Sequence, residues 1–182
     1  HYLTEAELVE NANYLKPRIK KKKVIVFIAG GPNKYYDFND KIIEKIFIKT
    51  KKNFINQDYQ LIFIPSMRTP RRIVDKAQDF FDDDQIIISD IDKKAYLSAL
   101  SLADHIIVTC DSTSMISEAA MTGRPIYVAQ MPSIKKNIRF QKFFELFKSL
   151  DIIKNLEDKV EEWSYKKLNE THRISGYIEK QF

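Results

Sequence analysis

The sequence predicts an α/β protein with a Rossmann-like parallel sheet and helices on both faces. The first observation is that short apolar runs alternate with longer stretches of helical periodicity, the pattern that βαβ units produce. The second is that the run at 23–29 is apolar without alternation, as in a central strand covered on both sides. The third is that turn-forming residues follow most of these runs. Strands are expected at 23–29, 59–64, 85–89, 105–109 and 125–129.

Cap residues mark the helices between these strands. Thr4 and Glu7 form a capping box that opens a helix reaching about Leu15, and Pro17 then breaks it. A later helix is expected to end at Gly123, because glycine readily adopts the left-handed conformation of a C-cap. Thr69 as N-cap and Pro70 as first helical residue predict a further helix, and the remaining helices are expected over 39–52, 92–102 and 114–121.

The chain is expected to form one domain over residues 1–182. Residues 1–22 would supply an N-terminal helix and a basic lead-in to the first strand. From residue 135 to 182 the pattern indicates only helices packed on the domain, one of them opening near Asn169. Trp163 and Tyr165 are expected to pack this terminal segment back onto the domain.

Size and composition limit the classes of protein to which the chain can belong. With 182 residues, 44% of them hydrophobic, the chain can bury a core, and its twelve Phe and nine Tyr exclude a disordered chain. The single cysteine, Cys110, excludes a disulfide scaffold and indicates a reducing compartment, so a cytoplasmic location is expected. No apolar run reaches the roughly 18 residues of a membrane span. Because the chain begins with His1 rather than Met, we expect further sequence upstream.

The net charge of +5 does not by itself indicate nucleic-acid binding. Lysine dominates over arginine, and Ile, Lys, Asn, Tyr and Phe are enriched together, as AT-rich codon usage would produce. No nucleic-acid partner is therefore expected. One group of cations and aromatics has the spacing of an amphipathic helix, for which core packing is expected and docking peripheral to the inner membrane is the alternative; its members are Lys135, Lys136, Arg139, Phe140, Lys142, Phe143 and Phe144.

Candidate ligand-binding residues lie in the loops that follow four of the predicted strands. Ligands of open parallel sheets bind at the carboxyl ends of the strands, where such loops converge. Small residues, hydroxyl groups and an arginine there indicate an anionic ligand, because helix N-termini offer free N–H groups and a positive dipole end. The candidates are Gly30, Gly31, Asn33, Ser66, Arg68, Thr69, Asp90, Ile91, Asp111, Ser112, Thr113, Ser114, Met115 and Glu118.

The segment from Asp111 to Glu118 is the most informative of these. Ser112, Thr113 and Ser114 are expected at a helix N-terminus, where backbone amides can hold a phosphate. Glu118 follows Ser114 by four residues and so lies on the same helix face, roughly 6 Å along the axis. A carboxylate there can accept both hydroxyls of a ribose; an ordinary helix ion pair is the alternative. Asp111 beside the helix start is expected to cap the helix or to complement its dipole, and a catalytic role is the alternative.

Two familiar phosphate-binding motifs are absent from the sequence. Gly30 and Gly31 do not continue into a Rossmann fingerprint, and there is no Walker lysine motif. Phosphate binding would therefore depend on helix termini and Arg68. No metal is expected, because the three histidines are scattered without ligand spacing. Cys110 follows a buried strand and is interpreted as a small core residue.

Several motifs, taken in order, match those of a known family. They are 30–33, Arg68-Thr69-Pro70, 102–109, Asp111-Ser112 through Met115, Ser117-Glu118-Ala119, Thr122-Gly123-Arg124-Pro125 and the tail from Trp163 to Thr171. With these motifs the chain resembles the nucleotide-sugar half of a GT-B glycosyltransferase and, more narrowly, a bacterial and plant family named after a mitochondrial-fission factor. Bacterial members of that family are often labelled glycosyltransferases or nucleoside-diphosphate-sugar epimerases.

This resemblance implies a GT-B C-terminal domain that binds a nucleotide sugar, with an N-terminal acceptor domain missing from the chain. It implies that Glu118 holds the ribose, that residues 112–115 hold the diphosphate, and that Arg68 steadies phosphate charge. The loop at Asp90 and Ile91 would meet the base. The expected substrates are a UDP-type sugar donor and an unknown acceptor, with no further cofactor. No residue is an evident general base, so the catalytic residue stays unassigned.

The chain departs from the family pattern in two places. Met67 stands where the family usually has the first of two arginines, and Lys94-Ala95-Tyr96 stands where it has Asn-Pro-Tyr. Two alternative functions therefore stay open beside the transferase. One is a nucleoside-diphosphate-sugar epimerase on the same fold, and the other is a non-catalytic interaction module like the fission factor, which the Met67 departure favours.

Overall fold

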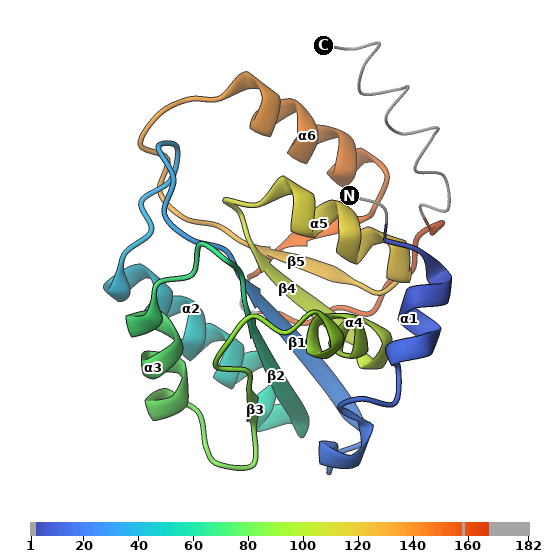
Figure 1. The fold of residues 1–182 in the computed structure, drawn as a ribbon. Helices are drawn as coiled ribbons and strands as arrows, with labels where there is room; N and C mark the ends of the chain where they lie inside the picture. Colours follow the sequence, from blue (N-terminus) through green and yellow to red (C-terminus); the bar gives the residue numbers. More distant parts are fainter. Residues whose placement is uncertain (1–2, 158, 168–182) are drawn as a thin grey trace.

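The fold is built on one six-stranded sheet in which all neighbouring strands are parallel (Figure 1). The computed structural model describes residues 3–157 and 159–167. The strand order is β3-β2-β1-β4-β5-β6, which is that of a doubly wound sheet. The strands are β1 (Lys23–Ala29), β2 (Tyr59–Pro65), β3 (Ile86–Ile87), β4 (His105–Thr109), β5 (Ile126–Ala129) and β6 (Ile153–Asn155).

Helices cover both faces of this sheet, so the predicted fold class is confirmed. In Figure 1, α2 and α3 lie on one side of the sheet, whereas α4 and α5 lie on the other. The first helix, α1, packs against α4. The helices are α1 (Glu5–Asn11), α2 (Asp40–Asn53), α3 (Arg71–Phe80), α4 (Lys93–Leu102), α5 (Thr113–Ala119) and α6 (Ile138–Ser149), with short 3₁₀ turns at Lys16–Arg18, Ile55–Gln57 and Ala120–Thr122.

The core lies between the central strands and their covering helices. Every residue of β2 is buried, and so is every residue of β1 after its first, because helices cover both faces. Phe27 of β1 packs its ring against Phe47 of α2 and Phe63 of β2, with centroids 5.5 and 5.6 Å away. The continuous apolar runs in the sequence therefore mark the strands of the core.

Three expectations about the elements are wrong. The first helix ends at Asn11 rather than near Leu15, because the Leu15 amide donates to Ser98 Oγ of α4 (2.9 Å) instead of continuing the helix. The third strand has only two residues, 86–87. The region from residue 135 onward is not helical throughout, because β6 pairs with β5 after α6. The helix expected near Asn169 lies outside the described residues.

The segment after β6 packs against the amino ends of the strands. Trp163 places its ring 5.0 Å from that of Tyr127 on β5 and donates from Nε1 to the Asp151 carbonyl (2.8 Å). Tyr165 donates to the Arg124 carbonyl (2.9 Å). The expected packing of Trp163 and Tyr165 is confirmed. No helix within the described ranges has the length and apolar character needed to cross a membrane.

Candidate functional site

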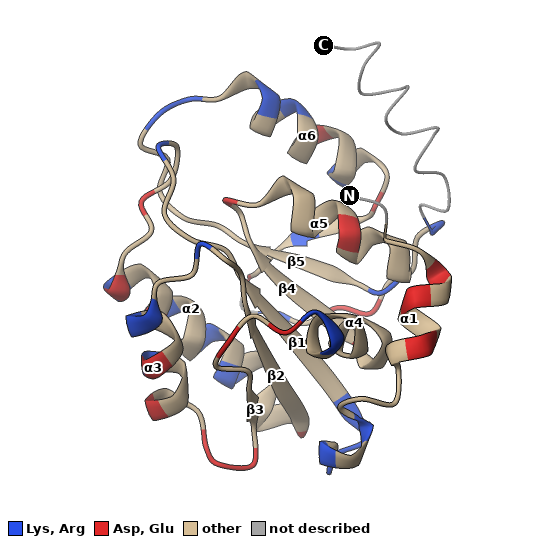
Figure 2. Cartoon of the chain, in the orientation of Figure 1, with Lys and Arg blue, Asp and Glu red and all other residues tan. Residues whose placement is uncertain are grey.

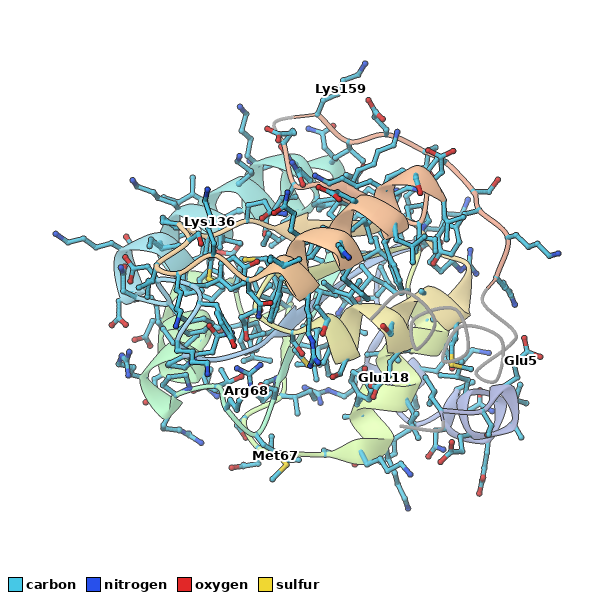
Figure 3. The ribbon with its side chains drawn as sticks, turned by 90° about the horizontal axis from the view of Figure 1, so that it is seen from above. Glu5, Met67, Arg68, Glu118, Lys136 and Lys159 are labelled. Atoms are coloured by element: carbon cyan, nitrogen blue, oxygen red, sulfur yellow. The ribbon has the colours of Figure 1, made fainter. Side chains whose placement is uncertain are left out.

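The candidate site lies where the direction of the strand order changes, between β1 and β4. Parallel sheets leave a crevice at such a point, because the connections from the two strands run to opposite faces. The loops after β1, β2 and β4 meet there, as expected from the sequence. Viewed from above in Figure 3, Met67 and Arg68 lie on the loop after β2, and Glu118 lies across from them on α5.

Asp111 ties these three loops together. Its side chain is fully buried, and Oδ2 accepts hydrogen bonds from the Gly31 amide (2.9 Å) and from Arg68 Nη2 (2.8 Å). Arg68 also donates from Nη1 to the Gly31 carbonyl (3.1 Å). The expectation that Asp111 caps the following helix is wrong: the N-cap is Ser112, and no side chain caps that helix. The carboxylate instead pairs with Arg68 across the crevice.

Arg68 therefore has two roles, one in its ion pair with Asp111 and one at the solvent-facing edge of the crevice. Its ion pair with a buried carboxylate neutralises part of its charge and holds the loop after β2 in place. The guanidinium is nevertheless 43% exposed, so it still faces solvent at the edge of the crevice. Sequence reasoning found this arginine but could not find its pairing with Asp111, which lies 43 residues away.

Gly30 and Gly31 allow the loops to approach one another closely. A Cβ atom on Gly30 would lie 2.1 Å from Asp111 Oδ2, and one on Gly31 would lie 2.0 Å from the Arg68 carbonyl oxygen. The Gly30 amide donates to Thr109 Oγ1 at the end of β4 (2.7 Å). These two glycines, predicted as ligand-binding residues, are thus required for packing between the loops.

Thr69 and Asn33 also direct their polar groups to neighbouring loops. Thr69 Oγ1 lies within donating distance of the Ala29 and Gly30 carbonyls (2.8 and 2.7 Å). It consequently does not cap α3, whose N-cap is Pro70 without a side-chain bond, so that prediction is wrong. Asn33 accepts from the amides of residues 35 and 36 and donates to the Asp111 carbonyl. Both residues shape the crevice from within.

A cavity of about 490 Å³, here called the α4–α5 cavity, opens beside these loops. It lies between the carboxyl ends of β1 and β2 and the helices α4 and α5. Five of the predicted site residues line it: Ser66, Ile91, Ser114, Met115 and Glu118. Asp90 does not line it; its side chain is 84% exposed and lies 3.6 Å from Arg71.

Glu118 and Tyr96 form the polar wall of the α4–α5 cavity. Tyr96 of α4 donates from its hydroxyl to Glu118 Oε2 (2.5 Å). Burial raises the pKa of Tyr96 well above its usual value, and the neighbouring Glu118 carboxylate raises that pKa further. The phenol therefore stays protonated and fixes one carboxylate oxygen at the cavity wall.

Sequence reasoning did not select Tyr96 as a site residue, although it lay in the segment that departs from the family pattern. Tyr96 and Glu118 are 22 residues apart in the sequence, and neither helix nor strand periodicity relates residues at that separation. Met67, Leu3 just before α1 and Glu7 of α1 also line the cavity. Nothing in the local sequence indicates that α1 folds over α4 to reach it.

The first turn of α5 borders the same cavity. Because Ser112 makes no capping bond, the first N–H groups of the helix have no partner from a cap side chain. Ser114 is exposed and Thr113 half-buried. Cys110 precedes this turn and is buried, and burial raises the pKa of its thiol to about 12, so it behaves as the core residue expected. Within the described ranges, no three His, Cys, Asp or Glu residues cluster as metal ligands.

Residues 1–182 match the family described as mitochondrial fission ELM1. The chain belongs to this family. Uncharacterized protein RP120 of Rickettsia prowazekii is 30% identical over 164 residues, which are 86% of this chain and 46% of the relative. Mitochondrial fission protein ELM1 of Arabidopsis thaliana is 37% identical over 87 residues, which are 47% of this chain and 20% of the relative.

Solved structures share the fold of this ELM1-family chain. UDP-GlcNAc 2-epimerase of Neisseria meningitidis, bound to UDP-GlcNAc, superposes with a TM-score of 0.51 at 18% identity. The superposition covers 95% of this chain and 45% of the epimerase chain. The chain thus spans about half the length, or less, of these relatives.

Proposed function

We propose that this chain is the nucleotide-sugar-binding half of a GT-B-type glycosyltransferase and that the α4–α5 cavity holds the nucleoside of the donor. The observation that carries the proposal is the Glu118 carboxylate, fixed by Tyr96 one helical turn beyond the first turn of α5. The epimerase of the same fold binds a nucleotide sugar, as its description states, which supports this choice of ligand class.

The ribose, the diphosphate and the base of the ligand would each contact a different set of residues along the crevice. The two ribose hydroxyls would donate to Glu118, while the diphosphate would lie against the N–H groups of residues 112–115. The exposed part of the Arg68 guanidinium would add positive charge there. The base would rest among the apolar side chains that line the cavity, including Ile91 and Met115. A UDP-type donor and no further cofactor are part of this proposal.

The half described here would bind the donor and stabilise its leaving group. As the bond between sugar and diphosphate breaks, negative charge develops on the diphosphate. The helix terminus and Arg68 would stabilise that charge. The acceptor and the general base would come from the other half of the protein, so no catalytic residue is assigned here. A cytoplasmic location, peripheral to a membrane, belongs to the same proposal.

The direct test is a calorimetric titration of the chain with UDP, compared with the variant Glu118→Gln. The variant keeps the size of the side chain and removes its charge, so UDP should bind at least about tenfold more weakly. Tyr96→Phe, which loses only the hydroxyl that orients the carboxylate, should weaken binding by a smaller factor. Glu10→Gln, an exposed change on α1, is the matched control and should bind UDP like the wild type.

Two results would contradict the proposal. If the wild-type chain does not bind UDP or other nucleoside diphosphates, the site assignment fails, and the non-catalytic interaction module becomes the better function. If Glu118→Gln binds UDP as tightly as the wild type, the ribose does not contact Glu118.

An epimerase is the second candidate, favoured by the fold likeness that covers nearly the whole chain. An epimerase needs no acceptor, whereas a transferase does. Product analysis with a protein that contains both halves separates the two. Interconversion of two nucleotide sugars without any acceptor would identify the epimerase.

A further inference from the structure

A second cavity lies on the other side of α5. It measures about 1000 Å³ and opens between α5 and the start of α6; we call it the α5–α6 cavity. Its α5 wall carries three hydroxyl side chains, those of Thr113, Ser114 and Ser117. Ser114 also lines the α4–α5 cavity, so the two cavities meet at the first turn of α5.

The opposite wall is held in place by pairing between two loops. Tyr36 and Ser133 form an antiparallel bridge, and the Ile134 amide donates to the Tyr35 carbonyl (2.8 Å). The ring of Phe140 on α6 lies 5.4 and 5.5 Å from those of Tyr35 and Tyr36. The start of α6 is thereby fixed over the loop that follows β1, and the aromatic rings form an apolar part of the cavity wall.

Three cations at this cavity have no partner among the residues that the structure describes. The side chains of Lys135, Lys136 and Arg139 make no hydrogen bond or ion pair with any described residue, although all three line the cavity. Other exposed lysines, such as Lys22, Lys41 and Lys45, likewise make no hydrogen bond or ion pair with a described residue, so these three cations are distinguished by lining one cavity together. An unpaired cluster of like charges is unfavourable unless something else neutralises it.

The two cavities beside α5 differ in charge. No acidic residue is among those that line the α5–α6 cavity, whereas Glu7, Asp92 and Glu118 line the α4–α5 cavity. Figure 2 shows the contrast: basic residues mark the loop into α6 and the start of that helix, whereas the one charged residue of α5 is acidic. The positive end of the α6 dipole adds to the basic side.

We propose that the α5–α6 cavity binds the sugar of the donor and selects an acidic one, bearing a carboxylate or a phosphate. This rests on the proposed function, which places the nucleoside in the α4–α5 cavity and the diphosphate at the first turn of α5. The sugar is the next group along the donor, and the next space is the basic cavity. Hydroxyls of α5 match sugar hydroxyls, the aromatic rings match an apolar ring face, and the three cations match an acidic substituent.

The test compares two donors that differ only at C6 of the sugar: UDP-glucuronate carries a carboxylate there, and UDP-glucose a neutral hydroxymethyl group. Titrations use the wild-type chain and the triple variant Lys135→Gln, Lys136→Gln, Arg139→Gln. The wild type should bind UDP-glucuronate about tenfold more tightly than UDP-glucose, and the triple variant should bind both alike. The control triple Lys22→Gln, Lys41→Gln, Lys45→Gln removes the same charge from exposed sites and should keep the preference. Equal affinity in the wild type, or a preference that survives in the first triple variant, would overturn the proposal.

A second measurement separates this proposal from the proposed function. Glucuronate 1-phosphate, which lacks the nucleoside, should shift the backbone amide resonances of 113–117 and 135–140. If it does so while UDP fails to bind, the nucleotide site is wrong and the acidic-sugar site stands. If UDP binds and glucuronate 1-phosphate shifts none of these resonances, the acidic-sugar site is wrong.

An anionic membrane surface is the competing occupant, because Ile134 and Ile138 beside the cations are 65% and 69% exposed. Vesicles containing phosphatidylglycerol test it. Binding of these vesicles that the triple variant loses, without any response to glucuronate 1-phosphate, would assign the cations to a membrane and overturn the sugar proposal. If neither neutral nor anionic vesicles bind, the result would favour the proposal of an acidic-sugar site.

Discussion

The two edges of the sheet differ in how their side chains are used. At the carboxyl edge, buried Asp111 joins three loops through polar contacts, and two cavities flank α5. At the amino edge, His105 packs its ring against those of Phe54, Tyr59 and Tyr127, with centroids 5.7, 5.5 and 6.0 Å away. The carboxyl edge is joined by buried polar contacts, whereas the amino edge packs aromatic rings around His105.

The difference follows from the direction of the helices. In a parallel α/β fold, helices begin near the carboxyl edge, so unpaired N–H groups and positive dipole ends lie there. A ligand can use these groups only if the loops around them are fixed, and the contacts of Asp111 with Gly31 and Arg68 fix them. In the described part of the chain no α-helix begins at the amino edge, which therefore has no unpaired N–H groups of this kind. Packing aromatic side chains there increases the buried apolar area.

The largest expected effect comes from breaking the carboxyl edge with Asp111→Ala. The change leaves the Gly31 amide and the Arg68 guanidinium without their acceptor. The free energy of unfolding, measured with urea, should fall by about 3 kcal/mol, less than for a fully buried pair because Arg68 is partly exposed. Asp90→Ala, an exposed aspartate of a neighbouring loop, is the control and should change stability by less than about 0.5 kcal/mol. An equal loss in both variants would show that Asp111 does not hold the loops.

A smaller effect is expected from opening the amino edge with Tyr127→Phe. The Tyr127 hydroxyl donates to the Glu161 carbonyl (3.0 Å) and accepts from the Glu161 amide (2.7 Å). Losing both bonds while keeping the ring should cost about 1–2 kcal/mol in urea unfolding. Tyr14→Phe removes one exposed hydroxyl bond to Asp92 and should cost much less. If the two variants unfold alike, segment 156–167 contributes little to closing this edge.

The smallest expected effect is a pH dependence from His105. Burial lowers the pKa of His105 below its usual 6.5, and neither ring nitrogen makes a hydrogen bond with a described residue, although the Glu162 carboxylate lies 3.4 Å from Nε2. The unfolded chain therefore binds the proton more readily than the folded chain. Stability should fall as the pH drops through about 6.5, by less than about 1 kcal/mol from this residue.

Unfolding curves of the wild type and His105→Phe between pH 7.5 and 5 measure this contribution. The variant keeps an aromatic ring and should lose part of the acid sensitivity. Identical pH profiles for the two proteins would mean that His105 has the same pKa in the folded and unfolded chains.

Most of the fold could be predicted from the sequence, and the exceptions have local causes. The strands β1, β2, β4 and β5 are continuous apolar runs, which follow from burial on both faces. The edge strand β6 was not predicted, because its three residues Ile-Lys-Asn lack that signal. Thr69 has the composition of an N-cap, yet the carbonyls of Ala29 and Gly30 compete for its hydroxyl.

The candidate site, like the fold, could be predicted from the sequence only in part. Sequence spacing placed Ser114 and Glu118 on one face of one helix, and both line the α4–α5 cavity. It could not show that Arg68 pairs with Asp111 or that Tyr96 orients Glu118, because these partners come from different elements. Each pairing depends on how the elements pack and has no periodicity along the chain.

The sequence alone determined the parallel α/β fold, the loops that gather at the carboxyl edge of the sheet and the membership of a family. Hydrophobic periodicity and cap chemistry are local, so the order of residues suffices for them. Only the tertiary structure decided which of the predicted polar residues face a cavity and which fasten the loops. It also decided that three cations without a partner in the described part of the chain line the cavity on one side of α5, and that a carboxylate lines the cavity on the other. Distances between elements determine these properties, because burial and hydrogen bonding depend on neighbours that are remote in the sequence.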